Sequence, residues 1–250
     1  MSVAIICQPM LILSLDTTTR AGSCALLQDD DVVHEQIGDG SRDQAERLPR
    51  DVATLLERQG VTLPDVDAFA VATGPGSFTG LRVGIATMQG LAMAMQKPLI
   101  GVSAFDALAW LANSEPPGSP RGPDEVRAKK VEVATWIDAW RGEVFAARFE
   151  NGLVVGEPVV APPDVLLARL KGRPTLFTGD GASLYESRIR AELGDDARFA
   201  MPIAPALAGA VATLAGRVYR AGERPLPHAI RPIYVRRSDA ELAADRRAAR

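Results

Sequence analysis

Short apolar runs alternate with longer amphipathic stretches along this chain, a pattern typical of a protein that mixes strands with helices. Three apolar runs near the N-terminus, separated by turn residues, predict a meander of strands at residues 10–15, 22–27 and 32–37. Ser41 has Gln44 three residues after it, which is the spacing of a capping box. A helix is therefore expected to run from this box toward Gln59, with Gly60 as its stop.

The next helix carries a row of glycines. An apolar run at 66–73 predicts a buried strand, and Ser77, after Gly-Pro-Gly, predicts the cap of a helix that reaches Gln96. Three glycines spaced four residues apart leave one helical face nearly without side chains: Gly76, Gly80 and Gly84. A glycine inside a helix costs about 1 kcal/mol relative to alanine. Something is therefore expected very close to this face, whether a neighbouring helix, a sheet, another chain or a ligand phosphate.

The pattern restarts after a segment rich in Pro, Gly and Ser, which predicts two lobes joined by a linker. We place the first lobe at 1–112, with residues 1–9 as a loose leader, the linker at 113–130, the second lobe at 131–225, and a C-terminal segment at 226–250 that packs back on the first lobe. The first lobe ends with a strand at 99–102 and a helix at 103–111. The second lobe is predicted to contain strands at 131–137, 144–149, 153–155 and 175–178, and helices at 164–170, 183–193 and 204–221.

Both halves share one order of elements: a strand ending in aspartate, two strands, a helix, a strand, Gly-x-Gly and a helix. A meander that gains helix-linked strands is typical of a lobe of the ribonuclease-H or actin type. The predicted fold class is therefore α/β, a two-lobed actin-like (ribonuclease-H-like) ATPase fold. Each lobe is a mixed sheet flanked by helices, and the lobes face each other across a cleft.

Composition narrows the setting. The 250 residues are 47% apolar and 24% charged, with a formal net charge of −3, so contact with nucleic acid is expected to be indirect. Cys7 and Cys24 lack CxxC spacing and predict free thiols in a reducing cytoplasm. The first ten residues lack a basic region, so no signal peptide is expected. No apolar run reaches the roughly 18–20 residues of a membrane span.

Catalytic constellations are missing from the sequence. The two histidines, His34 and His228, are far apart and form no HxxxH, so we predict no metal site. Ser77 lacks the Gly-x-Ser-x-Gly spacing and has no histidine near it in sequence, so a helix cap is the better interpretation of this serine. We predict no catalytic residue.

Phosphate binding stays open, because glycine loops that open helices can hold anions. The nucleotide candidates lie after the first strand and in two glycine loops: Asp16, Thr17, Gly74, Gly76, Gly179 and Gly181. The Walker and Gly-x-Gly-x-x-Gly patterns are absent, and threonines follow Asp16 where actin-type ATPases usually have glycine. An actin-like ATPase or sugar kinase that uses Asp16 and the glycine loops is the alternative. We assign no cofactor, and ATP or ADP at a shared subunit interface stays open.

Apolar stripes on the two first-lobe helices predict a docking surface for a partner, although internal packing must account for part of them. The predicted interface residues are Leu48, Val52, Leu55, Leu81, Ile85 and Met88. In the second half, Asp138 and residues 141–143 form a charged turn. A local ion pair and a partner contact both stay open for that turn.

Together these motifs resemble the TsaB (also called YeaZ) family, bacterial subunits of the machinery that makes threonylcarbamoyladenosine in tRNA. The matching pieces are LILSLDTTT, AERL, GPGSFTGLRVGIATMQGLA, PLIGVSAFDALA, DAWRGEVF, GDGA and PIYVR. They occur in the family's order and cover nearly the whole chain, and the GPGSFTGLR run is the most specific of them.

The resemblance implies a non-catalytic subunit that binds and activates a TsaD-like transferase through its N-lobe helices. It also implies a TsaE-like ATPase as a partner, a homodimer through the same surface, and only indirect contact with tRNA. Three departures affect the details: Gln44 stands where many relatives have histidine, Pro49-Arg50 replaces Leu-Pro, and Trp140 replaces an arginine. The contacts of the first helix and a ligand role for the charged turn are therefore left open.

Overall fold

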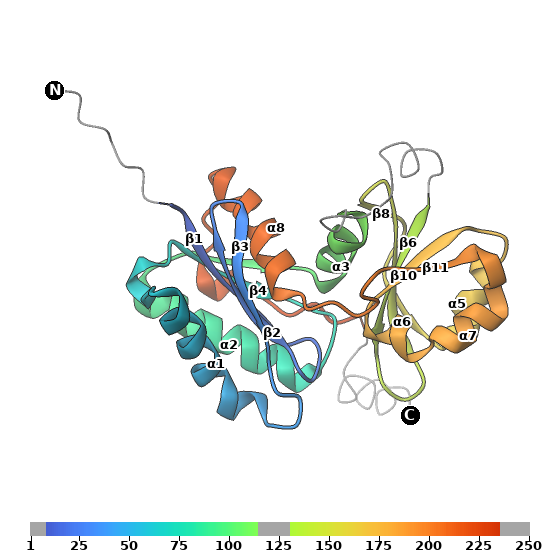
Figure 1. Cartoon of the computed structure of the whole chain (residues 1–250), viewed down its shortest axis with the longest axis horizontal. Helices are drawn as coiled ribbons and strands as arrows, with labels where there is room; N and C mark the ends of the chain where they lie inside the picture. The colour runs from blue at the N-terminus through green and yellow to red at the C-terminus, as the bar shows by residue number, and fades with distance from the viewer. Residues whose placement is uncertain (1–8, 115–130, 236–250) are drawn as a thin grey trace, which may run out of the picture. The chain divides into compact units, whose positions relative to one another are not determined.

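The computed structural model describes residues 9–114 and 131–235 (Figure 1). These residues form two compact units. Unit 1 comprises the described residues up to Leu111 together with Ala206–Pro232, and unit 2 comprises the other described residues. Within these ranges, no helix has both the length and the apolar character needed to span a membrane.

Unit 1 is built on a five-stranded sheet in the order β3-β2-β1-β4-β5. Its strands are β1 (Leu11–Asp16), β2 (Ser23–Gln28), β3 (Asp31–Ile37), β4 (Ala68–Ala72) and β5 (Leu99–Val102). The first three strands pair antiparallel as the predicted meander, and β4 and β5 join in parallel through helical connections. The predicted mixed sheet is therefore present in this unit.

Helices cover both faces of this sheet (Figure 1). Helices α1 (Gln44–Gln59) and α2 (Phe78–Met95) pack on one face, and α3 (Ala104–Asn113) and the short η1 (Leu63–Asp65) follow β5 and α1. On the other face, α8 (Ala208–Arg220) contacts all five strands, and η3 (Pro227–Ala229) follows it. Alternation along the strands explains the two layers, since Leu13 lies in the core cluster with α1 and α2 whereas Ser14 bonds to α8.

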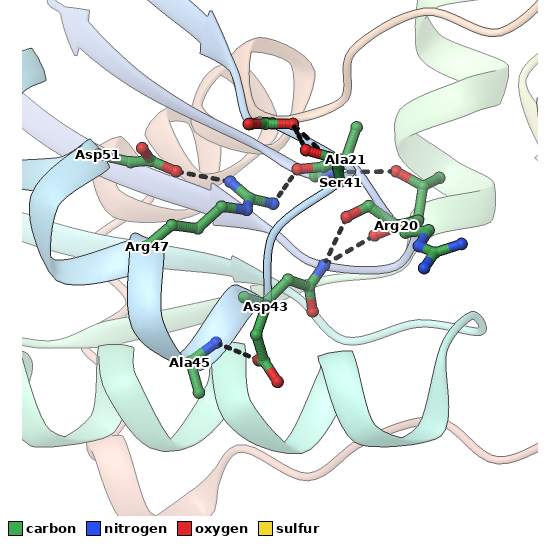
Figure 2. Close-up of polar contacts among 11 residues, drawn as sticks. Arg20, Ala21, Ser41, Asp43, Ala45, Arg47 and Asp51 are labelled. Atoms are coloured by element: carbon green, nitrogen blue, oxygen red, sulfur yellow. Dashed lines mark hydrogen bonds and ion pairs between the residues drawn. The ribbon is translucent and has the colours of Figure 1, made fainter.

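The predicted cap of α1 is wrong by two residues. The side chain of Asp43, not Ser41, caps the helix by accepting from the Ala45 N–H at 2.9 Å (Figure 2). The Ser41 hydroxyl instead donates to the Asp39 carboxylate at 2.6 Å. Ser41 and Asp43 both have short oxygen-bearing side chains that can cap a helix, so the sequence spacing alone could not choose between them. The predicted stop is confirmed, because Gly60 ends α1 with a φ of 64°.

Unit 2 contains a second mixed sheet, in the order β11-β10-β6-β7-β8, with β9 also paired to β7. Its elements are β6 (Glu132–Asp138), β7 (Val144–Glu150), β8 (Leu153–Val154), β9 (Val159–Ala161), α5 (Pro163–Leu170), β10 (Thr175–Thr178), α6 (Asp180–Leu184), α7 (Glu186–Leu193), η2 (Gly194–Asp196) and β11 (Ala197–Phe199). Its core includes Trp136 packed edge-to-face on Phe177, with ring centroids 5.3 Å apart. The sequence prediction missed β9 and β11 and merged α6 with α7, which separate at Tyr185.

The predicted lobe boundary at 225 is also wrong, because α8 belongs to unit 1. The Ser14 hydroxyl donates to the Ala208 carbonyl at 2.7 Å, and the Ser23 hydroxyl accepts from the Ala208 N–H at 3.0 Å. Both serines are distant in sequence from α8, and nothing in this alanine-rich helix indicates which sheet it covers. Residues 226–232 of the predicted C-terminal segment belong to unit 1, where Gln89 donates to the Pro227 carbonyl at 2.9 Å, whereas residues 233–235 belong to unit 2. The linker residues 115–130 and the segment 236–250 lie outside the described residues.

Candidate functional site

The row of glycines faces the turn between β1 and β2, with Gly76 just before α2 and Gly80 and Gly84 within it. A methyl group added at Gly76 would lie 2.5 Å from the Thr18 carbonyl oxygen, and one at Gly84 would lie 2.2 Å from the Thr17 hydroxyl oxygen. A methyl group added at Gly80 would lie 2.4 Å from the Thr17 carbonyl oxygen. The expected close neighbour is therefore this chain's own turn, and the glycines allow the helix backbone to approach it.

Backbone groups at the start of α2 are also used internally. The Ser77 N–H donates to the Thr18 carbonyl at 2.8 Å, and the Ser77 hydroxyl accepts from the Gly80 N–H at 3.2 Å, as the sequence predicted for this cap. The Leu81 N–H donates to the Ser77 carbonyl at 2.8 Å. Free N–H groups at a helix start hold phosphates in nucleotide-binding helices, and here those of Ser77 and Gly80 are directed to protein oxygens, whereas the Leu81 bond is an ordinary bond within the helix.

The predicted nucleotide candidates divide between the two units. Asp16 and Thr17 lie together in unit 1 and are buried, and Asp16 accepts from the Thr18 N–H at 2.9 Å. The hydroxyls of Thr17 and Thr18 are buried and find no hydrogen-bond partner within the described residues. In the same unit, Gly74 follows β4 and its carbonyl accepts from the Ala104 N–H at 2.8 Å.

Gly179 and Gly181 lie in unit 2, beside the carboxylates of Asp138 and Asp180. A methyl group at Gly181 would lie 2.9 Å from the Ile137 carbonyl carbon, so this glycine, like those of α2, permits close packing of backbone. The Asp180 carboxylate accepts from the N–H groups of Asp138 at 3.0 Å and Gly181 at 2.9 Å. Burial, with a smaller contribution from the Asp138 charge, raises the pKa of Asp180 above its ordinary value.

Two polar side chains of α1 hold the β1–β2 turn, and sequence reasoning missed both of them. Arg47 is 4% exposed; its guanidinium pairs with the Asp51 carboxylate at 2.5 Å and donates to the Ala21 carbonyl (Figure 2). Gln44 donates through its amide nitrogen to the Thr19 carbonyl at 2.8 Å. The available signal was the position of Arg47 beside Leu48 on the apolar stripe, since an arginine on the buried face of a helix needs fixed partners.

The six predicted interface residues lie inside unit 1. None of their side chains is more than 5% exposed, and five of the six belong to one core cluster with the sheet: Leu48, Val52, Leu55, Ile85 and Met88, with Leu81 buried separately. These side chains are therefore not available to a partner in this structure, and their assignment as contact residues is corrected. Each stripe covers the hydrophobic face of a sheet, which is the ordinary role of an amphipathic helix.

The outward face of α2 contains different residues. It consists of Phe78, Arg82, Ala86, Gly90 and Met93, all of which are exposed. Phe78 is 44% exposed, and the Arg82 guanidinium carbon lies 3.8 Å from the centre of its ring. A methyl group added at Gly90 would meet no atom within 4 Å. We refer to these five residues as the outer α2 face.

Metal-binding geometry is absent from the described part of the chain, where no group of three or more His, Cys, Asp or Glu side chains is placed to hold an ion. The Ser77 hydroxyl, the nucleophile candidate weighed above, serves as a helix cap that accepts from the Gly80 N–H. The features that could have a functional role are therefore the β1–β2 turn held by Gln44 and Arg47, the outer α2 face, and the carboxylates of Asp138 and Asp180 in unit 2.

Comparisons with known proteins agree with this architecture. A family model described as TsaD, tRNA N6-adenosine threonylcarbamoyltransferase, matches residues 30–243. The tRNA threonylcarbamoyladenosine biosynthesis protein TsaB of Escherichia coli is 36% identical over 65% of this chain and 67% of its own length. Its namesake from Bacillus subtilis is 32% identical over 74% of this chain and 77% of its own length.

A solved structure gives the same result for the fold. The crystal structure of an uncharacterized Pseudomonas aeruginosa protein with similarity to the peptidase YeaZ has a TM-score of 0.69 at 31% identity, covering 91% of this chain and all of that one. The predicted α/β fold class, with two mixed sheets flanked by helices, is confirmed. The chain belongs to the TsaB (YeaZ) family, within the wider group described by the TsaD model.

Proposed function

We propose that this chain is a non-catalytic subunit that binds and activates a TsaD-type transferase in the formation of threonylcarbamoyladenosine in tRNA. Its relatives are named for that biosynthesis, and the wider family model is that of the transferase itself. A non-catalytic role is supported by the turn between β1 and β2, where the carbonyls and side chains of Thr17 and Thr18 fill the glycine face of α2.

The outer α2 face is the observation that carries the partner-binding part of the proposal. Ala86 and Gly90 lie one turn apart and present almost no side-chain bulk, so another helix can approach closely along them. Met93 is 61% exposed and Phe78 is 44% exposed, and each supplies apolar area at one end of the face. A helix of the transferase is the partner that this shape fits.

The same surface can serve more than one complex. A homodimer through the outer α2 face would compete with the transferase, since both would cover the same residues. A TsaE-like ATPase would then join the assembled pair, and ATP or ADP would bind at a shared subunit interface rather than within the filled turn. Contact with tRNA would be indirect, in keeping with the net charge of −3.

Mixing experiments with a TsaD-family protein test the proposal. Size-exclusion chromatography of the folded chain with that protein should give a heteromeric peak. Ala86→Glu should abolish the peak by burying a charge in the interface, whereas Ala168→Glu, on the exposed face of α5 in unit 2, should leave it unchanged. Absence of a peak with the unaltered chain would refute the proposal, and normal pairing of Ala86→Glu would move the interface away from α2.

One observation keeps an ATPase or sugar kinase as a second candidate. The buried hydroxyls of Thr17 and Thr18 find no hydrogen-bond partner among the described residues, and these two threonines follow the buried Asp16 and lie against the glycine row. Calorimetry of the isolated chain with Mg-ATP separates the two functions. Micromolar binding accompanied by phosphate release would favour the enzyme, and no heat of binding would leave the non-catalytic role.

A further inference from the structure

A half-exposed tryptophan stands on the turn between β6 and β7. Trp140 is 48% exposed, and its backbone φ is 55°. The next two residues also have positive φ, 56° at Arg141 and 77° at Gly142. Glycine adopts this conformation readily, but larger residues rarely do. Trp140 and Arg141 thus occupy backbone conformations that glycine would adopt at a lower cost in stability. Such positions concentrate where a protein binds something.

Hydrogen bonds hold this turn in one shape. The Asp138 carboxylate accepts from the Trp140 N–H at 2.9 Å, and the Trp140 carbonyl accepts from the Glu143 N–H at 3.1 Å. The Ala139 N–H donates to the Glu143 carbonyl at 3.1 Å, and the Asp138 N–H donates to the Asp180 carboxylate at 3.0 Å. The indole is therefore presented on a braced backbone, which lowers the ordering cost of a contact made through it.

The charges on the turn that presents the indole select the kind of partner. The turn and its brace contain three carboxylates, on Asp138, Glu143 and Asp180, against the single guanidinium of Arg141. The face of an indole attracts cations, and nearby carboxylates strengthen that attraction. A phosphate backbone would instead meet net negative charge, and nucleic-acid affinity depends mainly on neutralising phosphates. The surroundings of Trp140 favour an arginine or lysine over a nucleotide.

We propose that the Trp140 turn, residues 138–143, is a docking surface for a partner protein that presents an arginine or lysine side chain to the indole. Tryptophan and arginine are the side chains most often found at the energetic centre of protein interfaces. This surface lies in unit 2, whereas the outer α2 face lies in unit 1. The two surfaces can therefore be altered independently, and failure of one proposal leaves the other standing.

The test uses the whole chain and its three tryptophans, each of which gives one indole N–H signal in a nitrogen–proton NMR spectrum. Trp136 is buried, and Trp110 is already covered by the Arg217 guanidinium at 4.0 Å from its ring centre. Three probes are used: a capped tripeptide with a central arginine, the same peptide with citrulline, and a single-stranded RNA hexamer. The peptides are titrated to about 0.2 M, because a contact worth about 1 kcal/mol is scarcely populated below that concentration, and the RNA to millimolar concentration. Citrulline keeps the shape of arginine and removes its charge.

The arginine peptide should shift the Trp140 signal alone, and citrulline should bind roughly two- to five-fold more weakly, the ratio expected for a cation–π contact at an exposed site. Trp140→Ala should abolish the arginine-dependent shifts of the neighbouring amides while leaving the Trp110 and Trp136 signals in place, which shows that the fold is retained. Leu153→Ala, at a side chain 73% exposed in the same unit, should change nothing. Equal binding of citrulline, a shift caused by RNA but not by peptide, or no shift with any probe would each overturn the proposal.

Discussion

Two glycines of α2 allow the close approach of helix and turn to be measured. Gly84 and Gly90 lie in the same helix, and replacing either with alanine gains about 1 kcal/mol of helix propensity. At Gly90 the new methyl group meets nothing within 4 Å, so Gly90→Ala should stabilise unit 1 by about that amount. The centre of the outer α2 face would still consist of small residues, Ala86 and the new alanine at position 90.

At Gly84 the same methyl group meets the side chain of Thr17. The distances are 2.2 Å to the hydroxyl oxygen, 2.9 Å to the methyl carbon and 3.1 Å to Cβ, and Thr17 is fully buried. A short buried side chain has no room to move aside, so the turn or the helix must shift. Overpacking of this kind costs about 1–3 kcal/mol. Because the propensity gain is common to both variants, the difference between them should equal this steric cost.

Native-state hydrogen exchange on β1 and β2 measures the free energy of opening of unit 1 itself, whatever unit 2 does. Amides such as those of Leu13 and Leu26 should exchange more slowly in Gly90→Ala and roughly 5- to 150-fold faster in Gly84→Ala than in Gly90→Ala, the range that corresponds to the steric cost. Equal exchange in the two alanine variants would refute the idea that the glycine row exists to admit the turn.

Three further predictions follow from buried polar groups. Arg47→Ala should lower the free energy of unfolding of unit 1 by about 3 kcal/mol, measured by denaturant titration, because it leaves Asp51 without its buried partner. Asp180 has a raised pKa in the folded state, so its contribution to the free energy of unfolding is complete below its unfolded pKa of about 3.9 and is lost as the pH rises through the folded pKa. The stability of unit 2 should therefore fall over this pH range, and Asp180→Asn should remove that fall. Burial, assisted by the charge of Asp51, raises the pKa of Cys24 to about 12, so native protein at pH 8 should leave this thiol unalkylated by iodoacetamide, as peptide mass spectrometry can check.

The sequence pattern determined most of the secondary structure, because strands and helices are set by local periodicity and by their end residues. The three-strand meander, the cap at Ser77 and the stop at Gly60 all depend on residues within one turn of the element they define. The errors share one cause, which is that the deciding contact is distant in sequence. Ser14 and Ser23 assign α8 to unit 1 across more than 180 residues, and nothing in the alanine-rich helix records that choice.

For the candidate site too, some features follow from the sequence and others only from the tertiary structure. The sequence alone established that a glycine row must admit a close neighbour, that no histidine pair is present, and that the motifs resemble one family. Only the tertiary structure decided that the neighbour is the Thr17–Thr18 turn, and that the apolar stripe of Leu48 and Ile85 is core, so a charge placed there would test folding rather than docking. The physical reason is that an amphipathic pattern specifies how much apolar surface a helix must bury, whereas the packing of the whole chain specifies what buries it.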